Sequence, residues 1–343
     1  MAHGIDEVAR AAGVSTATVS RALRGLPNVS AETRRRVADA AAQLGYVASP
    51  SAASLASGRT RTIGLLTPWI NHWFFANVIE GAERALRTRG FDALLYTFEV
   101  PRRAPRRRLD PDVLRRRVDG VLVVGLPLED GEVEALRDLG RPLVFIGTGV
   151  PGQVTVRLDD RTTGRRATEH LIDLGHRRIG HISGSPFDVA PASPPVERRE
   201  GWLEAMRAAG LAVDPTMETH GHFDVEGGRE SLATLLRQCP DLTAVFVASD
   251  EMAMGAILAA RALGLAVPDD LSVIGVDGHD LGELVGLTTM AQPAVDEGSA
   301  AATLLLDMIA GAPAPAEVVY PTTFVERGST AAPRPPAADP VHR

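Results

Sequence analysis

From residue 62 onward, short apolar segments alternate with longer amphipathic ones, and this alternation constrains the fold of the 343-residue chain most strongly. Each apolar segment has the length and composition of a strand buried on both faces. Such strands are predicted at Ile63–Leu66, Ala93–Tyr96, Val121–Val124, Leu143–Ile146, Ile179–Ile182, Val245–Val247 and Val273–Val276. Helices are predicted between them at Phe75–Arg89, Arg161–Leu174, Arg198–Ala209, Gly227–Arg237 and Glu251–Leu263. Strands and helices in this order build parallel sheets covered by helices, which is the α/β class.

Composition excludes several kinds of protein. No apolar run approaches the roughly 18 residues that a membrane-spanning helix needs, and the N-terminus lacks the apolar stretch of a secretion signal. We therefore expect a cytoplasmic protein with no membrane partner. The single cysteine, Cys239, allows no internal disulfide and no cysteine metal cluster, so neither a metal nor a cofactor is predicted.

The first 60 residues carry a separate pattern of three short helices. Ile5–Ala12 has its apolar residues at helical spacing, Thr16–Leu23 follows Ser15 as N-cap, and Ala31–Leu44 follows Ser30. Their expected core is Val8, Val14, Val19, Leu23, Val37 and Leu44. Two short helices joined by a glycine-containing turn form a helix-turn-helix, whose second helix enters the major groove of DNA.

The outward face of the second helix has residues suited to reading bases. Thr16, Ala17, Ser20 and Arg21 lie opposite its apolar side. An arginine can donate to both O6 and N7 of guanine, a threonine can contact a thymine methyl group, and an alanine permits close approach. Residues 1–60 also carry a net charge of +3, against −10 for the rest of the chain, which favours an anionic partner for this segment. The alternative is a solvated helix face that binds nothing.

The stretch "ASPSAASLASGRT" predicts a fourth, very short helix. Ser49 is its N-cap, Pro50 occupies its first position and Gly58 ends it. So short a helix is marginal alone because nucleation is costly. If it orders only on DNA, Leu55 can enter the minor groove as a wedge that unstacks a base step. The alternative is an ordinary linker whose leucine docks on the rest of the protein.

The stretches "IDEVARAAGVSTATVSRAL", "LGYVASPSAASL" and "TIGLLTPWINHWFFANVIEGAERAL" occur in the same order as in a known family. The chain resembles the lactose/galactose repressor family of bacterial transcription regulators over residues 4–327. By that resemblance Thr16, Ala17 and Arg21 match base-reading positions, and Leu55 matches the hinge leucine. The DNA-binding residues are therefore expected to be Ser15, Thr16, Ala17, Thr18, Ser20, Arg21, Arg24, Ser49, Ala52 and Leu55.

Three residues depart from the family pattern in this region. Arg24 replaces the usual asparagine after the recognition helix, Ala48 replaces a common proline and Ala53 replaces a frequent arginine. The arginine can add a phosphate contact. The two alanines leave the DNA contacts of the hinge less defined.

The resemblance also implies the domain organisation. Residues 1–48 would form the helix-turn-helix DNA-binding domain and residues 49–60 a hinge helix and linker. Residues 61–330 would form a core like a periplasmic binding protein, with two parallel-sheet subdomains and a ligand cleft between them. One subdomain would comprise about 61–159 with 292–320, and the other about 160–291 with 321–330. The proline- and alanine-rich tail at 331–343 is expected to be disordered.

Ligands of such sheets bind at the carboxyl ends of the strands. Trp69, Trp73, Phe74 and Phe75 follow the first strand within seven residues, and aromatic rings can stack on sugars or purines. Packing in the core at the start of a helix is the alternative for these rings.

Polar residues follow other predicted strands. Asp159, Asp250 and Asp277 each come at a strand end, where a carboxylate can accept hydrogen bonds from neighbouring hydroxyls. Arg198, at the start of a predicted helix, can bridge two oxygens. The alternative for Asp159 and Asp250 is that each only caps the helix that follows.

The family resemblance adds further cleft positions. Arg198 matches an effector-binding arginine, Asp277 the aspartate of "G-x-D", Ser249 a usual asparagine, Phe223 an aromatic wall and Gln292 a further cleft residue. The expected effector-binding residues are Trp69, Phe74, Phe75, Asp159, Arg198, Phe223, Ser249, Asp250, Asp277 and Gln292. Ser249 lacks an amide, and Gly147 stands where sugar-binding relatives can carry an aspartate, so the effector class stays open.

Three other patterns are not taken as sites. "GTGVPG" at 147–152 matches a dinucleotide-binding glycine pattern, but a strand-like segment follows it where a helix would be required. His170, His176 and His181 are interpreted as surface or helix-end histidines rather than metal ligands. The arginine run from Arg102 to Arg117 is interpreted as a solvated loop and helix face.

These inferences converge on a homodimeric, sequence-specific DNA-binding regulator, most simply a repressor, controlled by a small polar effector such as a sugar. Two copies are expected because one three-helix unit buries too little surface for strong specificity; a tetramer stays open. One alternative keeps DNA binding with a purine or nucleoside effector. Another is a small-molecule binding protein without DNA function. An enzyme is not expected, because no nucleophile elbow, metal cluster or cofactor loop occurs.

Overall fold

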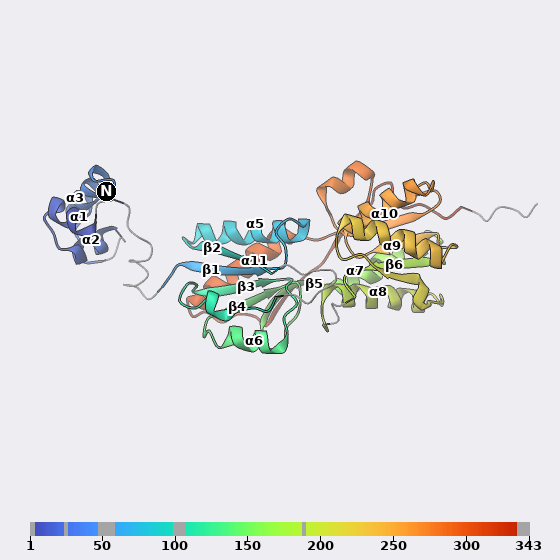
Figure 1. Ribbon diagram of the computed structural model, residues 1–343, viewed down its shortest axis with the longest axis horizontal. Helices are drawn as coiled ribbons and strands as arrows, with labels where there is room; N and C mark the ends of the chain where they lie inside the picture. The colour runs from blue at the N-terminus through green and yellow to red at the C-terminus, as the bar shows by residue number, and fades with distance from the viewer. Residues whose placement is uncertain (1–3, 24–26, 47–58, 99–106, 187–189, 335–343) are drawn as a thin grey trace, which may run out of the picture. The chain divides into compact units, whose positions relative to one another are not determined.

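The protein is described by a computed structural model at residues 4–23, 27–46, 59–98, 107–186 and 190–334. The chain divides into two compact units, one of residues 1–62 with 116–119 and one of residues 63–115 with 120–343. Figure 1 shows the elements of each unit. Within the described ranges, no helix has the length and apolar character needed to cross a membrane.

The first unit contains the three expected helices, α1 (Ile5–Ala12), α2 (Thr16–Leu23) and α3 (Ala31–Gln43). Ser15 Oγ accepts the Thr18 N–H at 3.2 Å and so caps α2, as expected. Their core consists of fully buried Val8, Val19 and Val37 with surrounding alanines, and Val14 and Leu44 pack partly against it. Leu23 was expected in this core but is 36% exposed, because Ala22 takes the buried position at the end of α2.

The second unit contains two sheets, each of six strands. The first sheet has the order β11-β5-β4-β3-β1-β2 and the second the order β12-β10-β9-β8-β6-β7. The strands of the first sheet are β1 (Thr62–Thr67), β2 (Asp92–Thr97), β3 (Gly120–Val124), β4 (Leu143–Ile146), β5 (Val154–Leu158) and β11 (Glu317–Tyr320). Those of the second are β6 (Ile179–Ser183), β7 (Glu218–His220), β8 (Ala244–Val247), β9 (Ser272–Asp277), β10 (Thr288–Ala291) and β12 (Thr323–Val325).

The central strands of both sheets pair in parallel, as the alternation of strands and helices predicts. In the first sheet Ile63 of β1 lies opposite Gly120 of β3, and in the second Ala244 of β8 lies opposite Ser272 of β9. β12 instead pairs antiparallel with β10. The buried strands β3 and β8 are uniformly apolar, whereas β2, at a sheet edge, exposes alternate residues.

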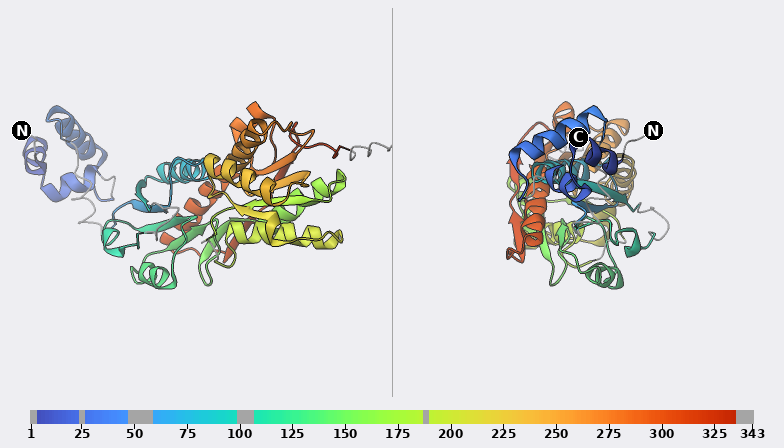
Figure 2. Two further views of the ribbon diagram at one scale, coloured as in Figure 1. Left: turned by 45° about the vertical axis from the view of Figure 1, so that its right-hand side comes forward. Right: turned by 90° about the vertical axis from the view of Figure 1, so that its left-hand side faces the viewer.

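Each sheet with its helices forms a lobe (Figures 1 and 2). The first lobe has α5 (Trp73–Thr88) and α6 (Asp130–Arg137) on opposite sides of its sheet, and α11 (Ala294–Ile309) packs on α5. The second lobe contains α7 (Asp160–Asp173), α8 (Pro194–Ala208), α9 (Val225–Gln238) and α10 (Asp250–Ala262). Short 3₁₀ turns lie at Pro111–Val113, Pro215–Met217 and Asp280–Val285, the last being η3.

The chain passes between the lobes three times, after β5, after β10 and after β11. Every passage follows the carboxyl end of a strand, so these ends face one another across the space between the lobes. Parallel sheets bind ligands at that edge.

Helices α7 and α8 approach closely enough to position a cleft residue. A Cβ on Gly164 of α7 would lie 2.2 Å from the backbone oxygen of Arg198, and one on Gly201 of α8 would lie 2.1 Å from the oxygen of Arg161. α8 begins at Pro194, four residues before the predicted start at Arg198, because proline is accepted in a first turn where no N–H partner is needed. Arg198 therefore lies in the second turn of α8.

Candidate functional site

The outward side of α2 exposes the residues expected to read DNA. Ser15, Thr16, Ala17 and Arg21 are exposed, whereas Thr18 and Ser20 are half-buried. Thr18 serves the cap, because its hydroxyl lies 3.0 Å from Ser15 Oγ. A hydroxyl, a methyl-sized side chain and a guanidinium therefore share one accessible helix face. Arg24, Ser49, Ala52 and Leu55 lie outside the described residues.

In the second unit, a cleft with a cavity of about 150 Å³ lies between the lobes. It is lined by the residues that follow β3, β4, β8 and β10 and by the ends of β5 and β9. Eight of the residues expected to bind an effector line it, namely Trp69, Phe74, Phe75, Arg198, Phe223, Ser249, Asp277 and Gln292. Further lining residues with titratable side chains are His72, Asp160, Glu251 and Glu297.

One wall of the cleft is aromatic. The ring of Phe75 meets those of Trp69 and Phe74 edge to face, with centroids 5.5 and 5.2 Å apart. Gly125, at φ +52°, makes room for this arrangement, because a Cβ there would lie 2.8 Å from the Phe75 ring. Phe75 is buried, while Phe74 and Trp69 are half-buried and line the cavity. The aromatic group therefore both packs in the first lobe and presents apolar surface to the cleft.

Arg198 is a buried cation in the second turn of α8, in the second lobe. It is 4% exposed, its Nε donates to Asp160 Oδ1 at 2.7 Å and its Nη1 donates to the Ala248 oxygen at 2.5 Å. Burial raises the pKa of Asp160, and the positive charge of Arg198 opposes that rise. The pair is thus held in place before any ligand binds.

The two aspartates at 159 and 160 have different roles. Asp159, expected in the cleft, does not line it, and its Oδ1 instead accepts the Thr162 N–H at 3.1 Å as the cap of α7. Asp160, one residue later, turns inward to Arg198. From the sequence, either of two adjacent acids after a strand could cap the helix or face the cleft. Only the direction of the helix axis decides which acid does which.

Asp277 ends β9 in a backbone conformation that favours glycine, with φ +135°. Its Oδ1 accepts Gln292 Nε2 at 2.6 Å, and its Oδ2 accepts the Asp250 N–H at 3.3 Å. Burial, followed by the nearby Asp250 carboxyl, raises the pKa of Asp277 well above its usual value. Gln292 comes from a passage between the lobes, so this contact ties the passage to the second lobe.

Asp250 was expected to bind the effector but does not line the cleft. Its Oδ2 accepts the backbone N–H groups of Gly278 and His279 at 2.9 and 2.8 Å, and its Oδ1 accepts the Thr289 hydroxyl at 2.7 Å. Burial raises its pKa to about 6. Asp250 therefore holds the loop after β9 against β10.

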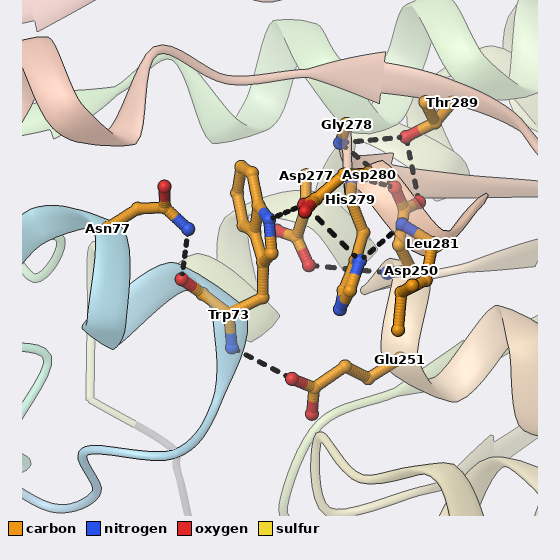
Figure 3. Close-up of polar contacts among 10 residues, drawn as sticks. All are labelled: Trp73, Asn77, Asp250, Glu251, Asp277, Gly278, His279, Asp280, Leu281 and Thr289. Carbon is orange, nitrogen blue, oxygen red and sulfur yellow. Dashed lines mark hydrogen bonds and ion pairs between the residues drawn. The ribbon is translucent and has the colours of Figure 1, made fainter. Parts of the chain in front are cut away.

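Four contacts cross the cleft between the start of α5 and the second lobe, and Figure 3 shows those of Trp73. The Trp73 N–H donates to Glu251 Oε1 at 2.8 Å, and His72 Nδ1 lies 2.5 Å from Glu251 Oε2. The Trp73 indole N–H donates to Asp280 Oδ1 at 2.6 Å, and its ring stacks on His279 with centroids 5.8 Å apart. The hydrogen bond to Glu251 raises the pKa of His72. We call these contacts the latch.

Glu297 contributes a carboxyl that the sequence analysis missed. It lies in the first turn of α11, is fully buried and lines the cleft. Neither of its oxygens has a hydrogen-bond partner among the described residues. Burial, followed by the negative charge of Asp160, raises its pKa to about 8. In sequence it is an ordinary acid near a helix start, so no local signal indicates its burial.

The three histidines form no metal site, and the described residues contain no group of histidine, cysteine and acid suited to one. The expected position at the surface or at a helix end is wrong for His181, which lies within β6, whereas His176 follows the end of α7 but is buried. His176 is 1% exposed and bonds Thr243 and the Ala331 oxygen, while His181 is fully buried between the rings of Trp202 and Phe246. Burial lowers the pKa of His181 to about 3, so it is a neutral core residue.

Comparisons with known proteins match both units. Residues 4–49 match the family described as "Bacterial regulatory proteins, lacI family", and residues 168–330 match "Periplasmic binding protein-like domain". The HTH-type transcriptional regulator CelR of Thermobifida fusca is 36% identical over 337 residues, with 95% of this chain and 97% of the relative covered.

Two solved structures are similar over nearly the whole chain. The complex of the transcriptional regulator CelR with cellobiose has 35% identity and a TM-score of 0.71, covering 95% of this chain and 99% of that one. The lac repressor dimer bound to operator and the anti-inducer ONPF has 25% identity and a TM-score of 0.83, covering 97% and 100%. The chain therefore belongs to the lacI family of bacterial regulatory proteins, whose members regulate transcription by binding DNA.

Proposed function

We propose that this regulator is a repressor that binds a near-palindromic operator as a homodimer and is controlled by a small sugar-like effector in the cleft. The observation that carries the proposal is the cleft itself, which combines an aromatic wall, a fixed arginine and several hydrogen-bonding side chains between two lobes. Such a combination suits a polyhydroxylated ligand, whose C–H faces stack on rings and whose hydroxyls bond to polar groups. The CelR structure with cellobiose gives a relative with a sugar in its complex.

Control by the effector requires that it bind two arrangements of the lobes with different affinity. The latch joins the lobes through Trp73, His72, Glu251 and Asp280, beside the cleft. A ligand that strengthens or breaks these contacts shifts the equilibrium between lobe arrangements. We propose that residues 49–60, with Leu55 as wedge, transmit this shift to the operator, and that residues 1–48 and 61–330 act as the DNA-binding and effector-binding domains.

The homodimer is supported by apolar side chains on the surface of the second lobe. Leu281 and Leu284 on η3 are 53% and 81% exposed, and Leu258 and Leu263 near α10 are 47% and 55% exposed. Large exposed apolar groups on neighbouring elements mark interaction surfaces. The lac repressor is a dimer in its operator complex. We propose that the protein acts in the cytoplasm, where a DNA-binding regulator has access to its operator.

A second effector class, a purine or nucleoside, is favoured by one observation. Phe74 and Trp69 are half-buried at the cavity edge, where they could stack on a base. The small-molecule binding protein without DNA function is excluded by membership of a family of DNA-binding regulators.

The test combines ligand binding with DNA binding. An operator is first selected from a random duplex library with the full-length protein. Thermal unfolding is then measured against sugars, nucleosides and sugar phosphates, because a ligand at ~100 times its dissociation constant adds roughly 2.7 kcal/mol to stability. The proposal expects a sugar both to stabilise the protein and to change operator affinity. Stabilisation by nucleosides alone would identify the effector as a purine or nucleoside. A ligand that stabilises the protein without changing operator affinity would contradict control through the cleft.

A further inference from the structure

Glu297 is unlike the other carboxyls that line the cleft. Asp160 is paired with Arg198, Asp277 accepts from Gln292, and Glu251 accepts from Trp73 and contacts His72. Glu297 is fully buried, yet both of its oxygens lack a partner within the described part of the chain. A buried polar group without a partner costs free energy, so such groups in native proteins call for a functional explanation.

The charged side chains that act on Glu297 already pair with each other. Asp160 of α7 has the largest electrostatic effect on Glu297, and the cation that opposes it, Arg198 of α8, already donates to Asp160 and to the Ala248 oxygen. Tyr320 of β11 is the other titratable group affected by Glu297, and it is neutral near pH 7 because its pKa is raised above 10.0. Four carboxyl groups therefore line the cleft, while its cations are Arg198 and, when protonated, His72. Neither cation donates to Glu297, so an entering amino group would supply the donor that its carboxyl lacks.

We infer that Glu297 binds an amino group of the effector, and that the effector is an amino sugar rather than a neutral one. The inference rests on the proposed function and adds its ligand class. The aromatic wall would hold the sugar ring, and the amino group would give the Glu297 carboxylate the charged hydrogen bond that it lacks. Hydrogen bonds between charged partners are about twice as strong as those between neutral groups, which makes this contact selective.

The first experiment measures binding to the full-length protein by calorimetry, using matched pairs of probes: glucosamine and glucose, galactosamine and galactose, and the β-1,4 disaccharide of glucosamine and cellobiose. At least one amino sugar is expected to bind about tenfold more tightly than its neutral counterpart. Glu297→Gln keeps the shape of the side chain and should remove this preference. Asp296→Asn is the matched control, since it removes a carboxylate from the same turn of α11 on the exposed side.

The second measurement counts protons, which a purely structural role of Glu297 would not change. At pH 6.5 the free amino group and Glu297 are both protonated, and in the complex they share one proton. Calorimetry in two buffers of different ionisation enthalpy should therefore show about one proton released per amino sugar bound. Glu297→Gln should abolish the release and Asp296→Asn should keep it.

The outcomes separate this inference from the proposed function. Equal or tighter binding of the neutral sugars, or an amino preference that survives Glu297→Gln, overturns the inference and leaves the sugar-controlled repressor intact. Binding of neither member of any pair overturns both.

Discussion

The backbone N–H of Trp73 donates to the side chain of Glu251 at 2.8 Å, although the two residues are 178 positions apart in the sequence. Trp73 begins α5 in the first lobe, and Glu251 lies in the first turn of α10 in the second. The same carboxylate contacts His72, so one side chain joins two groups across the cleft. This relationship makes the lobe arrangement sensitive to any change at Glu251.

Loss of the latch should lower the free energy of unfolding by an amount that depends on pH. The pKa of His72 is raised above 6.5 by Glu251, so the ion pair contributes fully below about pH 6.5 and is lost as the pH rises through the raised value. Glu251→Gln should remove about 1 kcal/mol or less at pH 6, because the pair is partly solvated. Urea unfolding should be measured for both proteins from pH 6 to pH 9. Their free energies of unfolding should become equal towards pH 9. A difference that stays constant with pH would contradict the role of His72. Glu83→Gln, on the exposed face of α5, is the control.

The buried carboxyl of Glu297 should make stability fall as the pH rises. In the fold its pKa is about 8, whereas the unfolded value is 4.5, so the folded chain holds the extra proton between these limits. Stability attributable to this group therefore declines from about pH 4.5 to about pH 8, by on the order of a few kcal/mol. Glu297→Gln should flatten the profile and raise the free energy of unfolding at pH 8. Unchanged stability at pH 8 would mean that the carboxyl is solvated.

Arg198 should be tested by a substitution that keeps its charge. Arg198→Ala would leave Asp160 as an uncompensated buried charge and cost about 3–5 kcal/mol of stability. Arg198→Lys retains the charge but cannot reproduce both donations of the guanidinium. We expect it to weaken effector binding roughly tenfold while leaving operator affinity in the absence of effector unchanged. Calorimetry measures effector binding and a gel shift measures operator affinity. An equal loss in both would mean that Arg198 stabilises the fold and does not contact the effector.

Arg21 should contribute to sequence-specific binding. Arg21→Ala removes an exposed guanidinium from the outward face of α2, and loss of a base contact costs about 1–3 kcal/mol. Specific operator affinity should fall by that amount, with a much smaller loss on random DNA, in fluorescence anisotropy at fixed salt. Equal losses on both duplexes would identify Arg21 as a phosphate contact. Arg84→Ala, in the second unit, is expected to change neither.

The apolar surface at η3 should hold two copies together. Leu284 is 81% exposed, so Leu284→Glu leaves the fold of one chain intact and places a charge in the proposed interface. Sedimentation should show a shift from dimer to monomer. Operator affinity should fall as well, because a single helix-turn-helix domain contacts only one half-site. Leu95→Glu, on the edge strand β2, provides a matched control. A dimer that persists in Leu284→Glu would place the interface elsewhere.

Much of the fold could be predicted because it depends on local patterns. The helices of the first unit agree with the predicted bounds within one residue, since their caps and apolar spacing are set by neighbouring residues. The central strands agree because apolar runs of four to six residues between helices have few other stable arrangements. The strands β7, β10, β11 and β12, by contrast, were not predicted. β11 and β12 expose half or more of their residues to some degree, so their apolar signal is weak.

The sequence by itself therefore determined the order of helices and strands, the parallel sheets and the outward face of α2, because each follows from periodicity over a few residues. Only the tertiary structure decided which acids face the cleft. Asp159 and Asp160 are adjacent, and Asp296 and Glu297 are adjacent, yet in each pair one side chain turns inward and the other does not line the cleft. Successive residues of a helix point about 100° apart, so the packing of the whole helix, rather than the residue type, sets which carboxyl is buried.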